Sequence, residues 1–264
     1  MVLEDLVHLF DDTFHPELQE DYDNAGFLLG DPHREVTGVL TALDLTEAVV
    51  DEALAKGLNL ILTHHPFIFS GLKRITPAST TGRLVLRLVE CGVAVYAAHT
   101  NLDNLLAGVN GILAANLNLA DCSILRPFKG RSDVGSGMVG SLPLPIPTPS
   151  FLAEVKSLLH LQSLRVNADA LSVRPCIQKV AICGGAGAFL IPDAIAAHAD
   201  IFLTADLKYH DFQKSEKQII LADIGHYESE QFSKGLLAGA VDALLHGSLP
   251  VCISSVCDRW EVWL

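Results

Sequence analysis

The sequence contains no apolar run of roughly 18 residues, the length that predicts a membrane span. It has no basic stretch ahead of an apolar core near Met1, so we expect no signal peptide. Charged residues make up only 19% of the 264 residues and hydrophobic residues 50%, a composition that excludes an intrinsically disordered chain. These properties predict a folded protein without a membrane-spanning segment.

Basic residues are also scarce: 18 Lys and Arg stand against 31 Asp and Glu, which gives a formal net charge of −13. Because general nucleic-acid binding needs clustered Lys and Arg, DNA is an unlikely partner. The six cysteines are scattered and form no C-x-x-C pair, so we expect buried thiols in a cytoplasmic protein. The sequence also has no G-x-S-x-G motif, and therefore no serine nucleophile of that type.

A pattern of strand, helix and strand occurs twice, with an offset of 141 residues. Residues 36–43, 46–56 and 58–63 form the first copy, in which Thr46 caps the helix and Gly57 closes it. Residues 180–183, 192–198 and 200–204 form the second copy, and the pair Leu62-Thr63 matches Leu203-Thr204. We interpret the match as an internal duplication within an α/β fold.

The duplication predicts two halves of the chain. We assign residues 1–125 and about 235–264 to the first half, and residues 126–234 to the second. Residues 126–150 are rich in Gly and Pro, so we expect a connector there rather than an element interior. A helix is expected to start at Thr148-Pro149 and to continue to about His160.

Side chains that can bind metal follow two of the predicted strands. His64 and His65 come directly after an apolar run, and His226-x-x-x-Glu230 follows another. Because neighbouring side chains of an extended segment point apart, His64 and His65 would each bind a different ion. On a helix, His226 and Glu230 would share one face. With Asp103, these residues predict a site for two divalent ions of Zn, Mn, Fe, Co or Ni, with one bridging carboxylate and open positions for water.

Other polar residues near strand ends are candidates for proton transfer or for contacts with substrate: His99, Asp206 and His210. The acidic turn at 21–26 could orient a substrate or a metal ligand, or it could simply be an Asx turn. The glycine-rich segment 183–187 could hold an anion with its amides, but it lacks G-x-G-x-x-G spacing, and a tight turn is the favoured interpretation.

Together, these segments resemble the Nif-three-like family, also called GTP cyclohydrolase I type 2 homologues. The resemblance rests on segments spread over nearly the whole chain: Asp23-Asn24-Ala25-Gly26, Thr63-His64-His65-Pro66, Ala98-His99-Thr100-Asn101-Leu102-Asp103, Gly108-Val109-Asn110, Cys183-Gly184-Gly185-Ala186-Gly187, Thr204-Ala205-Asp206 and Gly225-His226-Tyr227-Glu228-Ser229-Glu230. Two positions depart from the family pattern, since Tyr22 stands where the family has Trp and Ala205 where it has Gly.

The resemblance implies two intertwined α/β halves with mixed sheets, without the extra middle domain of long members. It also implies a two-metal site whose ligands are His64, His65, Asp103, His226 and Glu230, with Glu230 as the bridge. These are the residues already selected from their spacing. A homohexameric ring, built as a trimer of dimers, is implied as well.

The family label implies hydrolytic opening of the GTP imidazole ring with release of formate. Three functions remain open at this point. The first is a two-metal hydrolase that acts on GTP or on another small phosphorylated molecule. The second is a non-catalytic metal-binding or regulatory interaction protein. The third is a ring threaded by DNA, which the acidity of the chain disfavours.

Overall fold

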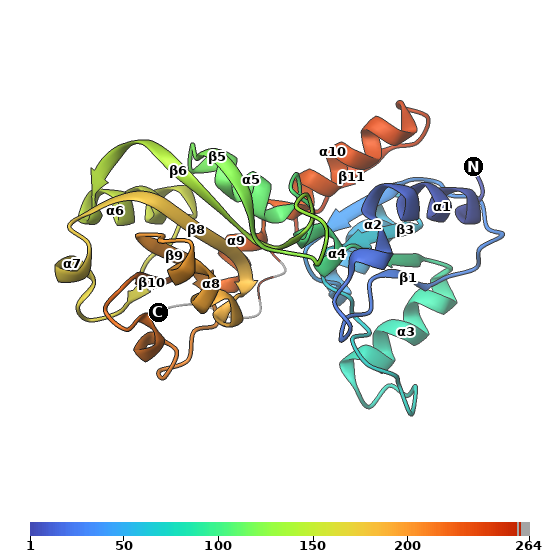
Figure 1. Ribbon diagram of the computed structural model, residues 1–264. Coiled ribbons are helices and arrows are strands. Elements are labelled where there is room, and N and C mark those ends of the chain that lie inside the picture. Colours follow the sequence, from blue (N-terminus) through green and yellow to red (C-terminus); the bar gives the residue numbers. More distant parts are fainter. Residues whose placement is uncertain (258, 260–264) are drawn as a thin grey trace. The chain divides into compact units, whose positions relative to one another are not determined.

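The computed structural model describes residues 1–257 and 259 and divides the chain into two compact α/β units (Figure 1). The first unit contains Met1–Leu102 and the described residues from Ser233 onward, and the second contains Asp103–Phe232. Each unit is built on one mixed β-sheet. The predicted fold class, a mixed α/β fold with two sheets, is therefore confirmed.

The sheet of the first unit has five strands in the order β1-β4-β3-β2-β11. Strands β2, β3, β4 and β11 are parallel, and β1 is antiparallel to β4. The strand bounds are Gly26–Leu29 for β1, Val39–Ala42 for β2, Leu60–Thr63 for β3, Ala94–Ala97 for β4 and Val251–Ile253 for β11. All residues of β2, β3 and β4 are buried, as expected for parallel strands covered on both faces.

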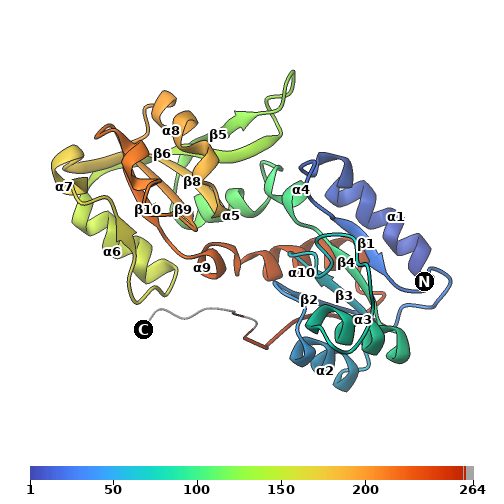
Figure 2. The ribbon, with the colours of Figure 1, turned by 90° about the horizontal axis from the view of Figure 1, so that it is seen from below.

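Helices cover both faces of this sheet (Figure 2). On one face, α2 (Glu47–Ala55) and α3 (Thr80–Cys91) pack against alternate strand residues such as Leu40, Ile61 and Val95. On the other face, Phe10 of α1 (Leu3–Phe14) packs edge-on against Tyr96, and α10 (Ser233–Leu245) lies against β2. The remaining elements are η1 (Pro16–Leu18) and the short helix α4 (Thr100–Asp103), which leads into the second unit.

The sheet of the second unit has six strands in the order β5-β6-β8-β9-β10-β7. The central strands β8, β9 and β10 are parallel to one another, and the other pairings are antiparallel. The bounds are Ala120–Pro127 for β5, Gly135–Pro147 for β6, Arg165–Val166 for β7, Cys176–Ala186 for β8, Ile201–Ala205 for β9 and Ile220–Asp223 for β10. Strand β7 is thus a two-residue edge strand.

Two apolar clusters fill the two faces of the second sheet. One joins Ile182, Leu203 and other strand residues to α5 (Val109–Asn116), α6 (Thr148–Leu158) and α7 (Ala170–Val173). The other joins strand residues such as Phe202 to η2 (Ala188–Leu190), α8 (Ile191–Ala196) and η3 (Phe212–Ser215). The short helix α9 (His226–Glu230) follows β10.

The internal repeat is visible in the register of the strands. In the first unit, Val39 pairs with Leu60 and Thr41 with Leu62. In the second unit, Val180 pairs with Ile201 and Ile182 with Leu203, so each pair recurs at the same offset of 141 residues. Two βαβ segments with identical register support the predicted duplication.

The Gly- and Pro-rich segment 126–150 is not a connector, because it contains the whole of β6. Pro143 and Pro145 lie between Ser141 and Ile146, where the β6–β8 register shifts. Their missing N–H groups therefore interrupt no regular series of hydrogen bonds between the two strands. At Gly140, a Cβ atom would come within 2.7 Å of the Cys122 sulfur. Here glycine reflects close approach of neighbouring strands rather than a loop.

The unit boundaries also differ from the predicted halves. Residues 103–125 were assigned to the first half, yet they contain α5 and most of β5, which belong to the second sheet and its core. Of the predicted range 235–264, residues 258 and 260–264 lie outside the described part of the chain. The return to the first unit at Ser233 falls close to the predicted position.

The cysteines are free thiols, but the expectation that they are buried holds only for Cys183. Cys91, Cys176 and Cys257 are exposed, and the first two lie at the ends of α3 and β8, where a side chain can face solvent. Among the described residues, no helix combines the length and apolarity required to cross a bilayer.

Candidate metal centre

In the first unit, polar side chains follow the carboxyl ends of three adjacent parallel strands. Asp44 follows β2, His64 and His65 follow β3, and His99 follows β4. The carboxyl edge of a parallel sheet is where α/β proteins place their ligand sites. Strand order therefore gathers side chains that are far apart in sequence.

The three histidines of this edge form one cluster. The ring centroids are 5.0 Å apart for His64 and His65, 5.3 Å for His64 and His99, and 5.4 Å for His65 and His99. One nitrogen of each ring lies within 4.8 Å of the others, so these residues could hold a metal ion. The expectation that His64 and His65 point apart is wrong, because β3 ends at Thr63 and the chain bends after it.

Each of these rings is anchored by its Nδ1 atom to an oxygen. His64 Nδ1 lies 2.8 Å from the carbonyl oxygen of Ala98, and His65 Nδ1 lies 3.1 Å from Oδ1 of Asp44. Because a carbonyl or carboxylate oxygen only accepts, Nδ1 carries the proton, and a neutral ring has its lone pair on Nε2. Metal-binding histidines in proteins show this arrangement, since the partner fixes both tautomer and orientation.

Asp23 anchors His99 in the same way. Its fully buried carboxylate accepts hydrogen bonds from His99 Nδ1 at 2.7 Å, from the amide of Asn24 at 2.7 Å and from the amide and hydroxyl of Thr100. Burial alone would raise the pKa of Asp23, but these hydrogen bonds and the nearby imidazole lower it to about 2. Asp23 in the acidic turn at 21–26 therefore orients His99, a role that was not predicted from the sequence.

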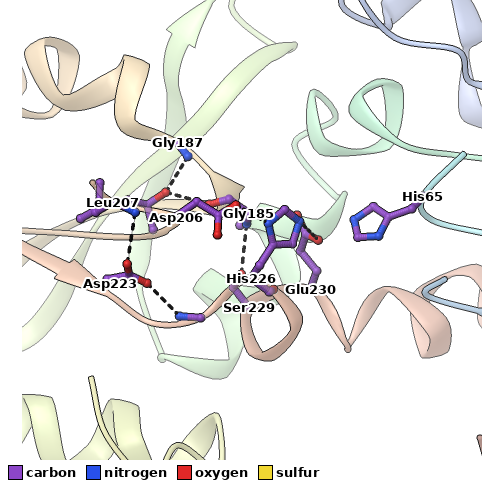
Figure 3. Close-up of polar contacts among 12 residues, drawn as sticks. His65, Gly185, Gly187, Asp206, Leu207, Asp223, His226, Ser229 and Glu230 are labelled. Carbon is purple, nitrogen blue, oxygen red and sulfur yellow. Dashed lines mark hydrogen bonds and ion pairs between the residues drawn. The ribbon is translucent and has the colours of Figure 1, made fainter. Parts of the chain in front are cut away.

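In the second unit, His226 and Glu230 converge as their spacing predicts. They lie at the two ends of α9, and His226 Nε2 is 3.0 Å from Oε2 of Glu230 (Figure 3). His226 Nδ1 lies 2.7 Å from Oδ2 of Asp206, which directly follows β9. The ring is thus held from both sides by carboxylates.

These contacts change the proton affinity of the groups involved. Burial alone would lower the pKa of His226, but the hydrogen bonds to Asp206 and Glu230 raise it to about 11. The hydrogen bond from His226 lowers the pKa of Asp206, and the charge of Arg165 acts in the same direction. Asp206 thus remains a carboxylate that orients His226.

Three further residues lie near Glu230: Asp103, Cys183 and Gly185. A carboxylate oxygen of Asp103 lies within 4.8 Å of one of Glu230, so Asp103, Glu230 and His226 supply two carboxylates and an imidazole. Burial raises the pKa of the Cys183 thiol, and both carboxylates add to that effect. Gly185 has φ +62°, and a Cβ atom there would collide with Oε1 of Glu230. Only glycine leaves room for this carboxylate.

The glycine-rich segment does not present its amides to an anion. Gly185 N donates to Ser229 Oγ at 3.0 Å (Figure 3). Gly184 N donates to Asn110 Oδ1 at 2.9 Å, and Gly187 N to Thr204 Oγ1 at 2.8 Å. The segment through Ala186 belongs to β8 and is followed by η2. Its amides hold the side chains of Asn110, Ser229 and Thr204, so a phosphate-binding role is not supported.

The donor set fits divalent transition metals. Four imidazoles (His64, His65, His99 and His226) have Nδ1 on an oxygen acceptor. Mixed imidazole and carboxylate ligands suit Zn, Mn, Fe, Co and Ni. Residue groups of this chain could therefore hold a metal ion.

Comparison with known proteins identifies the family of this chain. The model of the family "Duf34/NIF3 (NGG1p interacting factor 3)" matches residues 1–258. The chain belongs to this family. Family members similar to it include proteins named "GTP cyclohydrolase 1 type 2 homolog" from Clostridium perfringens, 34% identical with 87% of each chain covered, and from Lactococcus lactis, 36% identical with 82% of each covered.

Solved structures show the same fold. A hypothetical protein of Staphylococcus aureus superposes with a TM-score of 0.91 at 29% identity, covering 100% of this chain and 99% of that one. A Bacillus cereus protein related to NIF3 gives 0.89 with the same coverage, and at 22% identity the likeness extends to the fold alone. The family assignment made from the sequence motifs is confirmed.

Two site residues remain to be placed. His210 is exposed, and its ring contacts that of Tyr209 at 5.2 Å. Asp44 was missed from the sequence, although it occupies the same place after β2 that His65 occupies after β3. A search for polar residues directly after every predicted strand would have found it.

Proposed function

We propose that the chain is a divalent-metal-dependent hydrolase that binds two ions and opens the imidazole ring of GTP with release of formate. The observation that carries the proposal is the shared anchoring of Nδ1 in His64, His65 and His226, which leaves Nε2 of each ring as the nitrogen that would face a metal. The names of the curated relatives supply the reaction and the substrate.

The residues that would hold the ions are His64, His65, Asp103, His226 and Glu230, and Glu230 would be the ligand shared by both ions. Bound divalent ions lower the pKa of water towards neutrality and polarise the bond to be broken. Asp44 and Asp206 hold His65 and His226 in their tautomers. Asp206 therefore acts on a metal ligand rather than directly on a substrate proton.

His99 is the favoured residue for proton transfer, because the buried Asp23 fixes its Nδ1 and directs Nε2 towards the other two imidazoles. His210 remains a candidate, since its exposed side chain is available to a substrate. A His99→Asn variant should lose most turnover and keep its metal, whereas a ligand variant should lose both.

The proposal is tested by incubating the protein with GTP after loading it with Zn, Mn, Fe, Co or Ni in turn. Formate and the fluorescence of the pterin product should appear with at least one metal. They should disappear in His226→Ala and persist in His33→Ala, whose side chain is 81% exposed. Absence of both products with all five metals would reject the proposed reaction with GTP. Where metal is bound, it would favour a hydrolase with another substrate or a non-catalytic metal-binding protein.

The homohexamer implied by the family resemblance is part of the proposal, as is a cytoplasmic location. A trimer of dimers should have six times the 28.4 kDa mass of one chain in sedimentation or light scattering. A monomer at micromolar concentration would contradict it.

A further inference from the structure

The carboxylate of Asp223 contacts both loops that carry the Asp206–His226 pair. Asp223 ends β10, and its side chain is only 2% exposed. It accepts a hydrogen bond from the amide of Leu207 at 3.1 Å and another from the amide of Gly225 at 3.3 Å (Figure 3). Leu207 directly follows Asp206, and Gly225 directly precedes His226.

Both loops change direction at a residue with left-handed backbone. Asp206 has φ +56° and Gly225 has φ +78°. A non-glycine residue adopts this conformation at a cost in free energy, so neighbouring contacts must hold Asp206 there. The hydrogen bond between Leu207 N and Asp223 is such a contact, and it sets where the Asp206 carboxylate lies.

Arg165, on the edge strand β7, completes the arrangement. Its guanidinium forms an ion pair with Asp223 and donates to the carbonyl oxygen of Leu207 at 2.8 Å. It also lies over the ring of Phe212, 5.7 Å from the centroid. A buried carboxylate needs a charge partner of this kind, because an unpaired charge in the interior is strongly destabilising. Leu207 is thereby held through both its amide and its carbonyl group.

We propose that Asp223 and Arg165 are positioning residues for the His226 imidazole. They act through the loop at 206–207 and through Gly225. The inference deepens the proposed function, because His226 is a ligand of the proposed metal site. If the proposal is correct, Arg165, on the edge strand of the sheet, affects how tightly the site that contains His226 binds metal.

The second unit contains a matched control. Arg126 forms an ion pair with Asp193, donates to the carbonyl oxygen of Phe189 at 2.8 Å and lies over the Phe189 ring at 5.2 Å. In each arrangement an arginine contacts an aspartate, a backbone carbonyl group and a phenylalanine ring. They differ in that Asp193 lies in α8, whereas Asp223 holds the amides next to Asp206 and His226.

The first test needs no metal and no GTP. In metal-free protein with nitrogen-15-labelled histidine, His226 should give a downfield Nδ1–H signal, because Asp206 accepts that proton. Arg165→Gln and Asp223→Asn should lose or broaden this signal, and Arg126→Gln and Asp193→Asn should keep it. Arg165 is 44% exposed, so Arg165→Gln is the variant expected to fold normally if Asp223→Asn does not.

The second test is Co²⁺ affinity, measured by competition with a chelator. Arg165→Gln should bind about tenfold more weakly than the wild type, the low end of the loss typical for partners of metal ligands. Arg126→Gln should match the wild type. Retention of the His226 signal in Arg165→Gln, or wild-type Co²⁺ affinity in that variant, would overturn the proposal. Failure of GTP turnover alone would reject only the proposed reaction, since neither measurement uses GTP.

Discussion

Oδ2 of Asp206 lies 2.7 Å from Nδ1 of His226 and fixes which ring nitrogen faces Glu230. The same contact recurs in the first unit, where Asp23 holds His99 at 2.7 Å. In both places a carboxylate next to a strand end orients an imidazole from another strand end. The two units thus share an aspartate–histidine hydrogen bond as well as the register of their parallel strands.

Asp206→Asn should weaken binding of Zn²⁺ by about tenfold, because the amide keeps the shape of the side chain and loses its charge. Competition with a chromogenic chelator measures the change. Asp121→Asn is the matched control, since Asp121 is an exposed aspartate with a similar left-handed backbone, φ +52° against +56°. If Asp206→Asn and the wild type bind Zn²⁺ with equal affinity, the Asp206 carboxylate does not contribute to metal binding by His226.

Gly185→Ala should strongly reduce metal binding, because the new methyl group would displace the Glu230 carboxylate. Gly57→Ala is the control for backbone strain without a collision. Gly57 has φ +70°, and no atom lies near the position that its Cβ would take. Both variants should lose roughly 1–2 kcal/mol of unfolding free energy from the left-handed backbone. Only Gly185→Ala should lose metal, and unchanged metal content in that variant would contradict the placement of Glu230.

Glu52→Gln should make the stability of the protein less sensitive to acid. Glu52 accepts hydrogen bonds from the hydroxyl of Ser254 at 2.6 Å and from the amide of Ser255 at 3.1 Å, and it pairs with Lys56 at 2.9 Å. Burial alone would raise its pKa, but these contacts lower it from 4.5 to about 2. A depressed carboxylate pKa adds stability above pH 4.5, and that stability is lost as the pH falls from 4.5 to about 2.

At pH 7 the Glu52→Gln variant should therefore be less stable by about 1–2 kcal/mol. The difference should shrink on acidification and vanish near pH 2. Urea unfolding at several pH values measures it, with the exposed Glu90→Gln as control. A difference that stays constant between pH 7 and pH 2 would show that the carboxylate charge plays no part.

Local patterns predicted the elements that depend on local chemistry. Thr46 was expected to cap α2, and its hydroxyl accepts from the amide of Val49 at 3.2 Å. The i, i+4 spacing of His226 and Glu230 correctly predicted their contact, because one helical turn is enough to bring them together. The family motifs predicted the fold, which the family model and the solved structures confirm.

Features that depend on strand order could not be read from local patterns. The pairing of His65 with Asp44 requires β2 and β3 to be neighbours, and that of His99 with Asp23 requires β1 beside β4. Strand β6 was mistaken for a connector, because composition alone cannot distinguish a glycine crowded by Cys122 from a glycine in a loop. The roles of Asp223 and Arg165 likewise depend on contacts between β7, β10 and the loop after β9.

Metal content per chain is the most direct test of the central claim that anchored histidines and nearby carboxylates bind divalent ions. Purified protein, reloaded under mild conditions and analysed by inductively coupled plasma mass spectrometry, should retain two ions per chain. His64→Ala and His226→Ala should each lose metal while His33→Ala keeps the full content. Absence of bound metal in the wild type, or wild-type content in both ligand variants, would contradict the account.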